Sequence, residues 1–238
     1  MRAAVFSDTH SNWEALSAFL SFAKKQKVDQ YWMLGDIVGY GAEPQKVAEK
    51  IFEFSDIVIR GNHDQAISDD NLLRWFNEEA KEAILWTRKQ LKPKIKEKIT
   101  RLPYIRIEKN VTLTHATPLD PEQFTYIDSV KEATKAFPFF KTPICFIGHT
   151  HVPKIFSEKL NAAGYLNEGS YQLNRSDRYI ISCGSVGQPR DQDSRLSFGI
   201  FDDEQYSLQL VRIPYPKEEA AKKIIKAGLP KSFATRLL

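Results

Sequence analysis

Five apolar runs in this chain end in the same way, at a polar motif that contains aspartate, asparagine or histidine. The motifs are Asp8-Thr9-His10, Gly35-Asp36, Gly61-Asn62-His63-Asp64, His115 and Gly148-His149-Thr150-His151, and together they hold all five histidines of the chain. A short apolar run that stops at such a motif is typical of a buried strand. Because open α/β sheets bind ligands at the carboxyl ends of their strands, the sequence predicts that these motifs meet in one site.

The first three runs alternate with helical patterns. Strands are predicted over residues 2–7, 31–34 and 57–59, with one amphipathic helix after Asn12 and another from Pro44. Such a β-α-β-α-β order produces parallel strands joined by right-handed crossovers. Later strands are predicted over 105–107, 111–113, 144–147, 154–156, 179–182, 196–201 and 206–213, and later helices over 71–91, 130–137 and 217–227. The sequence therefore predicts an α/β fold.

These elements are interpreted as one domain, because 238 residues suit one large domain better than two. We expect it to span residues 1–214, with a helical insertion at about 65–102, and to be followed by a C-terminal helix and tail over 215–238. The aromatic residues of the insertion, Trp75, Phe76 and Trp86, are interpreted as packing residues rather than as platforms for a stacked base.

Composition excludes several classes of protein. Hydrophobic residues make up 42% and charged residues 27% of the chain, as in globular proteins and unlike disordered ones. No apolar run approaches the roughly 20 residues of a membrane-spanning helix, no signal peptide is recognisable, and two cysteines make no disulfide framework. We therefore expect a cytoplasmic protein without a membrane partner. A net charge of +4 and basic stretches at 88–101 and 217–226 allow a nucleic-acid partner but do not indicate one, since such stretches are usually solvated helix faces.

The residue types in the motifs favour metal binding. On an extended chain, residues i and i+2 point the same way, so Asp8 can converge with His10, and His149 with His151. Carboxylate and imidazole ligands without thiolate suit Mn, Fe, Zn, Ni or Co. The candidate ligands exceed the needs of one tetrahedral ion, whereas two divalent ions that share a carboxylate would use them all.

In combination, the motifs DxH…GDxVG…GNHD…H…GHTH, followed by GSVGQPRD, resemble those of the calcineurin-like metallophosphoesterase superfamily. They are most similar to its small bacterial and archaeal branch, which is related to diadenosine tetraphosphate hydrolases and phosphodiesterases. The match runs from Asp8 to Asp191. The resemblance implies the calcineurin-like phosphoesterase fold, a four-layer α/β/β/α sandwich of two mixed sheets.

The resemblance also implies a role for each motif residue. One ion would be held by Asp8, His10, Asp36 and His151, and the other by Asp36, Asn62, His115 and His149. Asp36 would then bridge the two ions, and a bridging hydroxide would attack phosphorus. His63 would be a non-ligand catalytic residue that faces the substrate and protonates the leaving oxygen, with Asp64 orienting it. Asn62, His63 and Arg190 would bind the substrate.

The function expected from these roles is dinuclear metal-dependent hydrolysis of a small phosphorylated substrate, by a phosphodiesterase or a phosphatase. Nucleotides and dinucleoside polyphosphates are candidate substrates, and manganese is a candidate metal. A nuclease or a protein Ser/Thr phosphatase remains an alternative, and a non-catalytic scaffold is less favoured because all five histidines are present. Ser182 and Leu119 stand where the family commonly has Asn and Arg, so Arg190 is expected to carry more of the substrate anchoring. The sequence assigns no oligomeric state.

Overall fold

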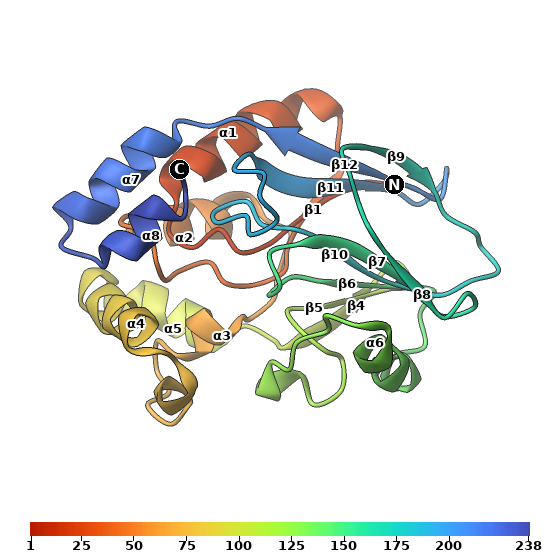
Figure 1. Ribbon diagram of the computed structural model, residues 1–238, viewed down its shortest axis with the longest axis horizontal. Helices are drawn as coiled ribbons and strands as arrows, with labels where there is room; N and C mark the ends of the chain where they lie inside the picture. Colours follow the sequence, from red (N-terminus) through yellow and green to blue (C-terminus); the bar gives the residue numbers. More distant parts are fainter.

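Two mixed β-sheets of six strands each pack face to face in the computed structural model, which describes residues 1–238 (Figure 1). The first sheet has the order β3 (Ile57–Val58), β2 (Gln30–Met33), β1 (Arg2–Phe6), β11 (Leu196–Asp202), β12 (Ser207–Ile213) and β9 (Gly169–Gln172). The second sheet has the order β4 (Ile105–Glu108), β5 (Val111–Thr114), β6 (Ile144–Ile147), β10 (Tyr179–Cys183), β7 (Pro153–Ser157) and β8 (Ala162–Tyr165).

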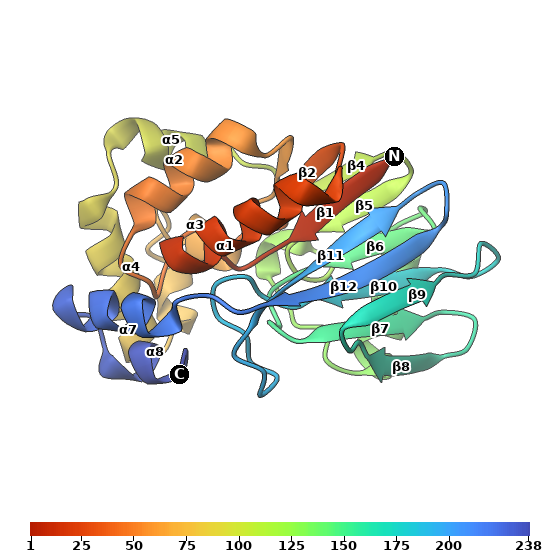
Figure 2. The same cartoon turned by 90° about the horizontal axis from the view of Figure 1, so that it is seen from above.

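Helices cover the outer faces of both sheets. Against the first sheet lie α1 (Trp13–Ala23) and α2 (Pro44–Phe54), with α7 (Lys217–Lys226) packed on α1 and α8 (Lys231–Thr235) on α7. Against the second sheet lies α6 (Val130–Ala136). Figure 2 shows α4 (Glu78–Gln90) and α5 (Pro93–Thr100) beyond one end of the sheets, and α3 (Asn62–Gln65) lies near them. Four short 3-10 helices complete the set: η1 (Lys24–Gln26), η2 (Leu72–Trp75), η3 (Pro121–Gln123) and η4 (Phe137–Phe139). The predicted four-layer sandwich is confirmed.

Alternation along the strands explains the layers. In β1, Ala3 and Val5 belong to the apolar cluster between the sheets, whereas Ala4 and Phe6 belong to the cluster under the helices. Successive side chains of a strand point to opposite faces, and here both faces are buried. Strands covered on both sides therefore read as continuous apolar runs, which is the pattern seen in the sequence.

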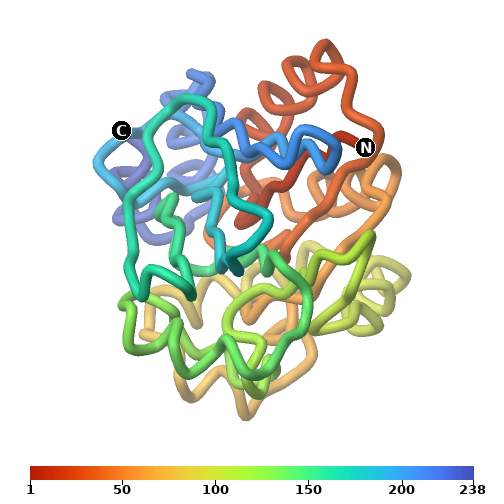
Figure 3. The backbone as a smooth tube through the Cα atoms, turned by 90° about the vertical axis from the view of Figure 1, so that its right-hand side faces the viewer, coloured from red at the N-terminus to blue at the C-terminus, as the bar shows by residue number.

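The parallel strands bring the motifs together. β1, β2 and β3 pair in parallel, as the sequence predicts, and so do β5, β6 and β10 of the other sheet. The motifs follow the carboxyl ends of these strands. Figure 3 shows that the two ends of the chain, in red and blue, share one half of the molecule, while yellow and green segments form most of the other half.

Several features differ from the sequence prediction. The helix predicted over 71–91 is divided, because the Asn77 side chain accepts a hydrogen bond from the Ala80 N–H at 2.8 Å and starts a new helix there. The predictions also missed α8 and the edge strands β8 and β9. Phe233 of α8 lies in the same apolar cluster as α1 and α2, while the domain boundary at residue 214 stays a prediction.

None of the helices combines the length and the apolar composition that crossing a membrane requires.

Candidate metal centre

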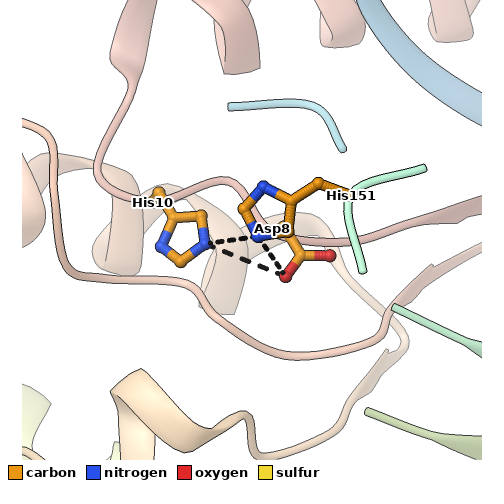
Figure 4. A group of neighbouring side chains, drawn as sticks. All are labelled: Asp8, His10 and His151. Carbon is orange, nitrogen blue, oxygen red and sulfur yellow. Dashed lines mark hydrogen bonds and ion pairs between the residues drawn. The ribbon is translucent and has the colours of Figure 1, made fainter. Parts of the chain in front are cut away.

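The structure brings the acidic and histidine motifs of both sheets into one buried site. Three groups of potential ligand atoms form, and within each group the atoms lie within 4.8 Å of one another. The groups are Asp8 with His10 and His151, then His10 with Asp36 and His63, and finally Asp36 with His115 and His149. Figure 4 shows how the first group converges from two separate loops. Asn62 joins the site through Oδ1, which lies 3.2 Å from His115 Nε2.

Each of the two carboxylates is anchored by one oxygen and presents the other to the centre. Asp8 Oδ2 accepts a hydrogen bond from the His149 N–H at 3.1 Å, and its Oδ1 has no hydrogen-bond partner. Asp36 Oδ1 accepts one from the His63 N–H at 2.9 Å. The free Asp36 Oδ2 lies 3.5 Å from His10 Nε2 and 3.4 Å from His115 Nε2. Asp36 thus stands between the first and third ligand groups, where a bridging ligand would have to stand.

Three histidine rings are oriented by backbone carbonyls. Nδ1 of His10, His115 and His151 lies 3.1, 2.6 and 2.6 Å from the backbone oxygens of Val38, Leu34 and Gln188. A ring nitrogen that faces a carbonyl oxygen carries a proton and donates it. When such a ring is neutral, as it must be to bind a metal ion, its Nε2 atom keeps a lone pair that is directed to the centre.

The backbone around the site is held in an uncommon conformation. Five of the seven predicted ligands have a positive φ: Asp8 (55°), His10 (44°), Asp36 (56°), His149 (65°) and His151 (60°). This left-handed region costs an L-residue roughly 1–2 kcal/mol. Gly61 shows how tightly the loops meet, because a Cβ atom there would collide with the Asp36 side chain. Strain of this kind clusters where a structure fixes functional groups.

The electrostatics of the site favour a cation. Burial alone would raise the pKa of Asp8 and Asp36, but the neighbouring histidines outweigh burial and hold both pKa values well below the usual range. Burial alone would lower the pKa of His115, but the charges of Asp36 and Asp8 raise it to about 9. The centre therefore attracts positive charge. Asp8 Oδ1 and His149 Nε2 are buried without partners, and such atoms are costly unless a ligand satisfies them. The residues present thus fit divalent metal ions.

Residues 1–205 match a family model described as the calcineurin-like phosphoesterase superfamily domain. The chain belongs to this superfamily. A relative from Methanocaldococcus jannaschii, the uncharacterized protein MJ0912, is 38% identical over 240 residues, which cover 98% of this chain and 96% of that protein. The superfamily resemblance of the motifs is confirmed.

Solved structures agree with this assignment. The crystal structure of a metallophosphoesterase from Sphaerobacter thermophilus is 38% identical, covers 100% of this chain and 98% of its own, and has a TM-score of 0.90. The hypothetical protein PH1004 from Pyrococcus horikoshii is 19% identical, with coverages of 99% and 97% and a TM-score of 0.81. It therefore shares the fold of this calcineurin-like phosphoesterase domain.

His63 lies beside the metal centre. Its side chain is buried, its Nδ1 has no partner, and its ring centroid lies 4.4 Å from that of Tyr40 and 4.9 Å from that of Phe76. Burial lowers the pKa of His63 to about 4, an effect that the negative charge of a neighbouring phosphoryl group would oppose. His63 is also close enough to His10 and Asp36 to share a metal, and its assignment as a non-ligand stays a prediction.

The predicted contact between Asp64 and the His63 imidazole is not formed. Asp64 Oδ1 accepts hydrogen bonds from the N–H groups of Ile37 and Val38 at 3.0 and 3.3 Å, and Oδ2 accepts one from Gly61 at 3.1 Å. Both oxygens are therefore used by the backbone. Asp64 ties the loop after β2 to the loop after β3, and in this way it supports Asp36 and Asn62 rather than the ring of His63.

A cavity of about 450 Å³ lies at the metal centre. Its lining consists of Asp36, Tyr40, Asn62, His63, Leu72, Trp75, Phe76, Asn77, Ala80, Gln123, Phe124, Thr125, Tyr126, His149, His151 and Arg190. Arg190 is exposed, and its Nη2 donates a hydrogen bond to Gln188 Oε1 at 3.1 Å, while its role in substrate binding stays a prediction. Leu119 and Ser182 do not line this cavity. The Ser182 hydroxyl oxygen accepts a hydrogen bond from the Gly184 N–H at 3.3 Å.

Several residues of the site were missed by the sequence analysis. The ring of Tyr126 stacks on His149 with centroids 3.9 Å apart, and the Tyr40 ring centroid lies 4.6 Å from that of His10 and 4.4 Å from that of His63. Tyr40 could have been found, because it stands in Gly39-Tyr40-Gly41 directly after the Asp36 motif. Tyr126 follows no strand and carried no signal. Of the aromatic residues in the insertion, Phe76 and Trp86 pack as predicted, but that prediction is wrong for Trp75, which is 87% exposed.

Proposed function

We propose that this chain is a hydrolase that cleaves a small phosphoester with the help of two divalent metal ions. The observation that carries the proposal is the position of Asp36 Oδ2, which lies 3.5 Å from His10 Nε2 and 3.4 Å from His115 Nε2. One carboxylate oxygen therefore lies near histidines of two separate ligand groups. Both Asp36 and Arg190 line the same cavity.

The side chains of the centre divide into two sets that share Asp36. Asp8, His10 and His151 would complete one site, and Asn62, His115 and His149 the other. Two ions held there would lower the pKa of a water molecule and offset the negative charge of the phosphoryl group. The backbone hydrogen bonds to both carboxylates and to three imidazoles keep these ligands in place.

Two residues outside the ligand sets would act on the substrate directly. Arg190 is the only lysine or arginine that lines the cavity, and a guanidinium group can bind two phosphoryl oxygens at once. His63 lines the same cavity, where its imidazole would supply a proton to the leaving oxygen.

The test combines metal analysis with hydrolysis. Protein stripped with a chelator is reloaded with Mn²⁺, then with Fe²⁺, Zn²⁺, Ni²⁺ or Co²⁺, and assayed on p-nitrophenyl phosphate and bis(p-nitrophenyl) phosphate. We expect about two ions per chain and metal-dependent hydrolysis. Asp36→Asn should lose both ions, Asp8→Asn mainly one, and Asp120→Asn, at an exposed aspartate, neither. One bound ion at saturation, or no hydrolysis with any metal, would reject the proposal.

A further inference from the structure

Trp75 differs from the rest of its segment because its side chain is not packed. Within η2, Leu73 is only 5% exposed and Leu72 packs against the same apolar cluster, whereas the Trp75 side chain is 87% exposed. Tryptophan is highly buried on average, so such exposure is unusual. Trp75 nevertheless lines the cavity of the metal centre. A large aromatic surface is therefore available to whatever occupies that cavity.

The two walls that carry aromatic residues are uncharged. The insertion contributes Leu72, Trp75, Phe76, Asn77 and Ala80, and the loop after β5 contributes Gln123, Phe124, Thr125 and Tyr126. In Figure 1 the insertion, beside α4, and this loop, before α6, both lie on the lower side of the molecule. Gln123 and Thr125 are exposed, so their amide and hydroxyl groups can meet the polar edge of a flat ring.

We propose that Trp75 is the platform on which the base of a nucleotide stacks while the phosphoryl group of that nucleotide lies at the metal centre. The phosphoryl end of this assignment rests on the function proposed above, whereas the base end rests on Trp75 and the uncharged walls. The aromatic face of a base suits stacking on an indole ring, and its ring edge carries donors and acceptors for Gln123 and Thr125.

Size and charge favour a nucleotide over a polymer. A cavity of about 450 Å³ is in the range of small-molecule sites. A nucleic-acid strand would bring further phosphates to a cavity in which Arg190 is the only Lys or Arg, although phosphate binding depends on several such cations. The same uncharged walls offer an aromatic surface that ribose or a simple alkyl phosphate would not use.

Binding of phosphonates tests this proposal without hydrolysis, because a P–C bond replaces the ester bond that would be cleaved. The probes are the 5′-phosphonate analogue of AMP, ribose 5-phosphonate, which lacks the base, and benzylphosphonate, which has a simple aryl ring. Each is titrated calorimetrically into the Mn²⁺-loaded wild-type protein and into Trp75→Ala and Trp75→Phe. Phe139→Ala is the matched control, because Phe139 is 53% exposed and lies outside the cavity.

We expect Trp75→Ala to weaken binding of the adenosine phosphonate about 10-fold or more, as loss of a stacked base does elsewhere. Trp75→Ala should bind ribose 5-phosphonate as the wild type does. Trp75→Phe should keep most of the affinity for the adenosine phosphonate, and Phe139→Ala should bind all three probes with wild-type affinity. The proposal would be overturned if Trp75→Ala bound the adenosine phosphonate as tightly as the wild type does, or if the wild-type protein bound it undetectably. So would an equal loss for all three probes, or a loss for benzylphosphonate as large as that for the adenosine analogue.

These outcomes are separate from the test of hydrolysis. If the wild-type protein binds the adenosine phosphonate through Trp75 but cleaves no ester, the base platform stands and the proposed activity fails. If it cleaves p-nitrophenyl esters but Trp75→Ala binds all three phosphonates normally, the activity stands and the platform is wrong.

Discussion

Replacing Asp64 distinguishes its observed role from the role that the motif suggested. The Asp64 carboxylate accepts three buried backbone hydrogen bonds, from Ile37, Val38 and Gly61. Each contributes about 0.5–1.5 kcal/mol net, so Asp64→Ala should lower the free energy of unfolding by about 3 kcal/mol. Asp64→Asn keeps Oδ1 but directs an N–H₂ group at the Gly61 N–H, so the free energy of unfolding should fall by about 1–2 kcal/mol.

The same change should weaken metal binding. Asp64 joins the loops that carry Asp36 and Asn62, and loss of such supporting partners typically costs 10–100-fold in metal affinity or activity. The assays are urea unfolding in the presence of a chelator, metal titration, and hydrolysis of phenyl phosphate and p-nitrophenyl phosphate. Asp64→Ala should lose activity on both esters to a similar degree, because the damage lies in the metal centre.

Asp177→Ala is the matched control. Asp177 is also buried and accepts three hydrogen bonds, from Ser157, Lys159 and Arg178, but it lies outside the cavity of the metal centre. The Asp177→Ala variant should lose a comparable free energy of unfolding and keep its metal affinity. If Asp64→Ala keeps stability and both ions but loses activity only on phenyl phosphate, Asp64 acts through His63 after all, and the reasoning from the backbone hydrogen bonds is refuted.

Two further predictions concern residues that face the substrate. His63→Ala should keep both ions and lose roughly 10²–10⁴-fold in rate on phenyl phosphate, but less on p-nitrophenyl phosphate, whose leaving group needs little protonation. His115→Ala should instead lose one ion and lose activity on both esters. An equal loss on both esters in His63→Ala would contradict its role as proton donor. Arg190→Ala should raise KM about 10-fold with metal content unchanged, because the exposed guanidinium would bind substrate and no metal. Steady-state kinetics with unaltered KM and kcat would exclude that role.

The sequence determined the elements that depend on local pattern. Continuous apolar runs formed the central strands, whose two faces are both buried, and a polar motif at the end of each run marked where the chain leaves the sheet. Parallel pairing then gathered Asp8 and Asp36 at one end of the first sheet, and His115 and His149 at one end of the second. This is why the candidate ligands could be predicted by residue number before their distances were known.

The tertiary structure alone decided which partners those residues have. Asp64 bonds to the backbone of a loop 27 residues away instead of to the neighbouring His63, and nothing in the local pattern announces this. Tyr126 reaches His149, and Trp75 turns out of its packed segment, for the same reason. A hydrogen bond, a ring contact or an exposed face depends on how loops from distant parts of the chain are juxtaposed. That juxtaposition exists only once the two sheets have packed, because the local sequence constrains the direction of a strand but not what its loops meet.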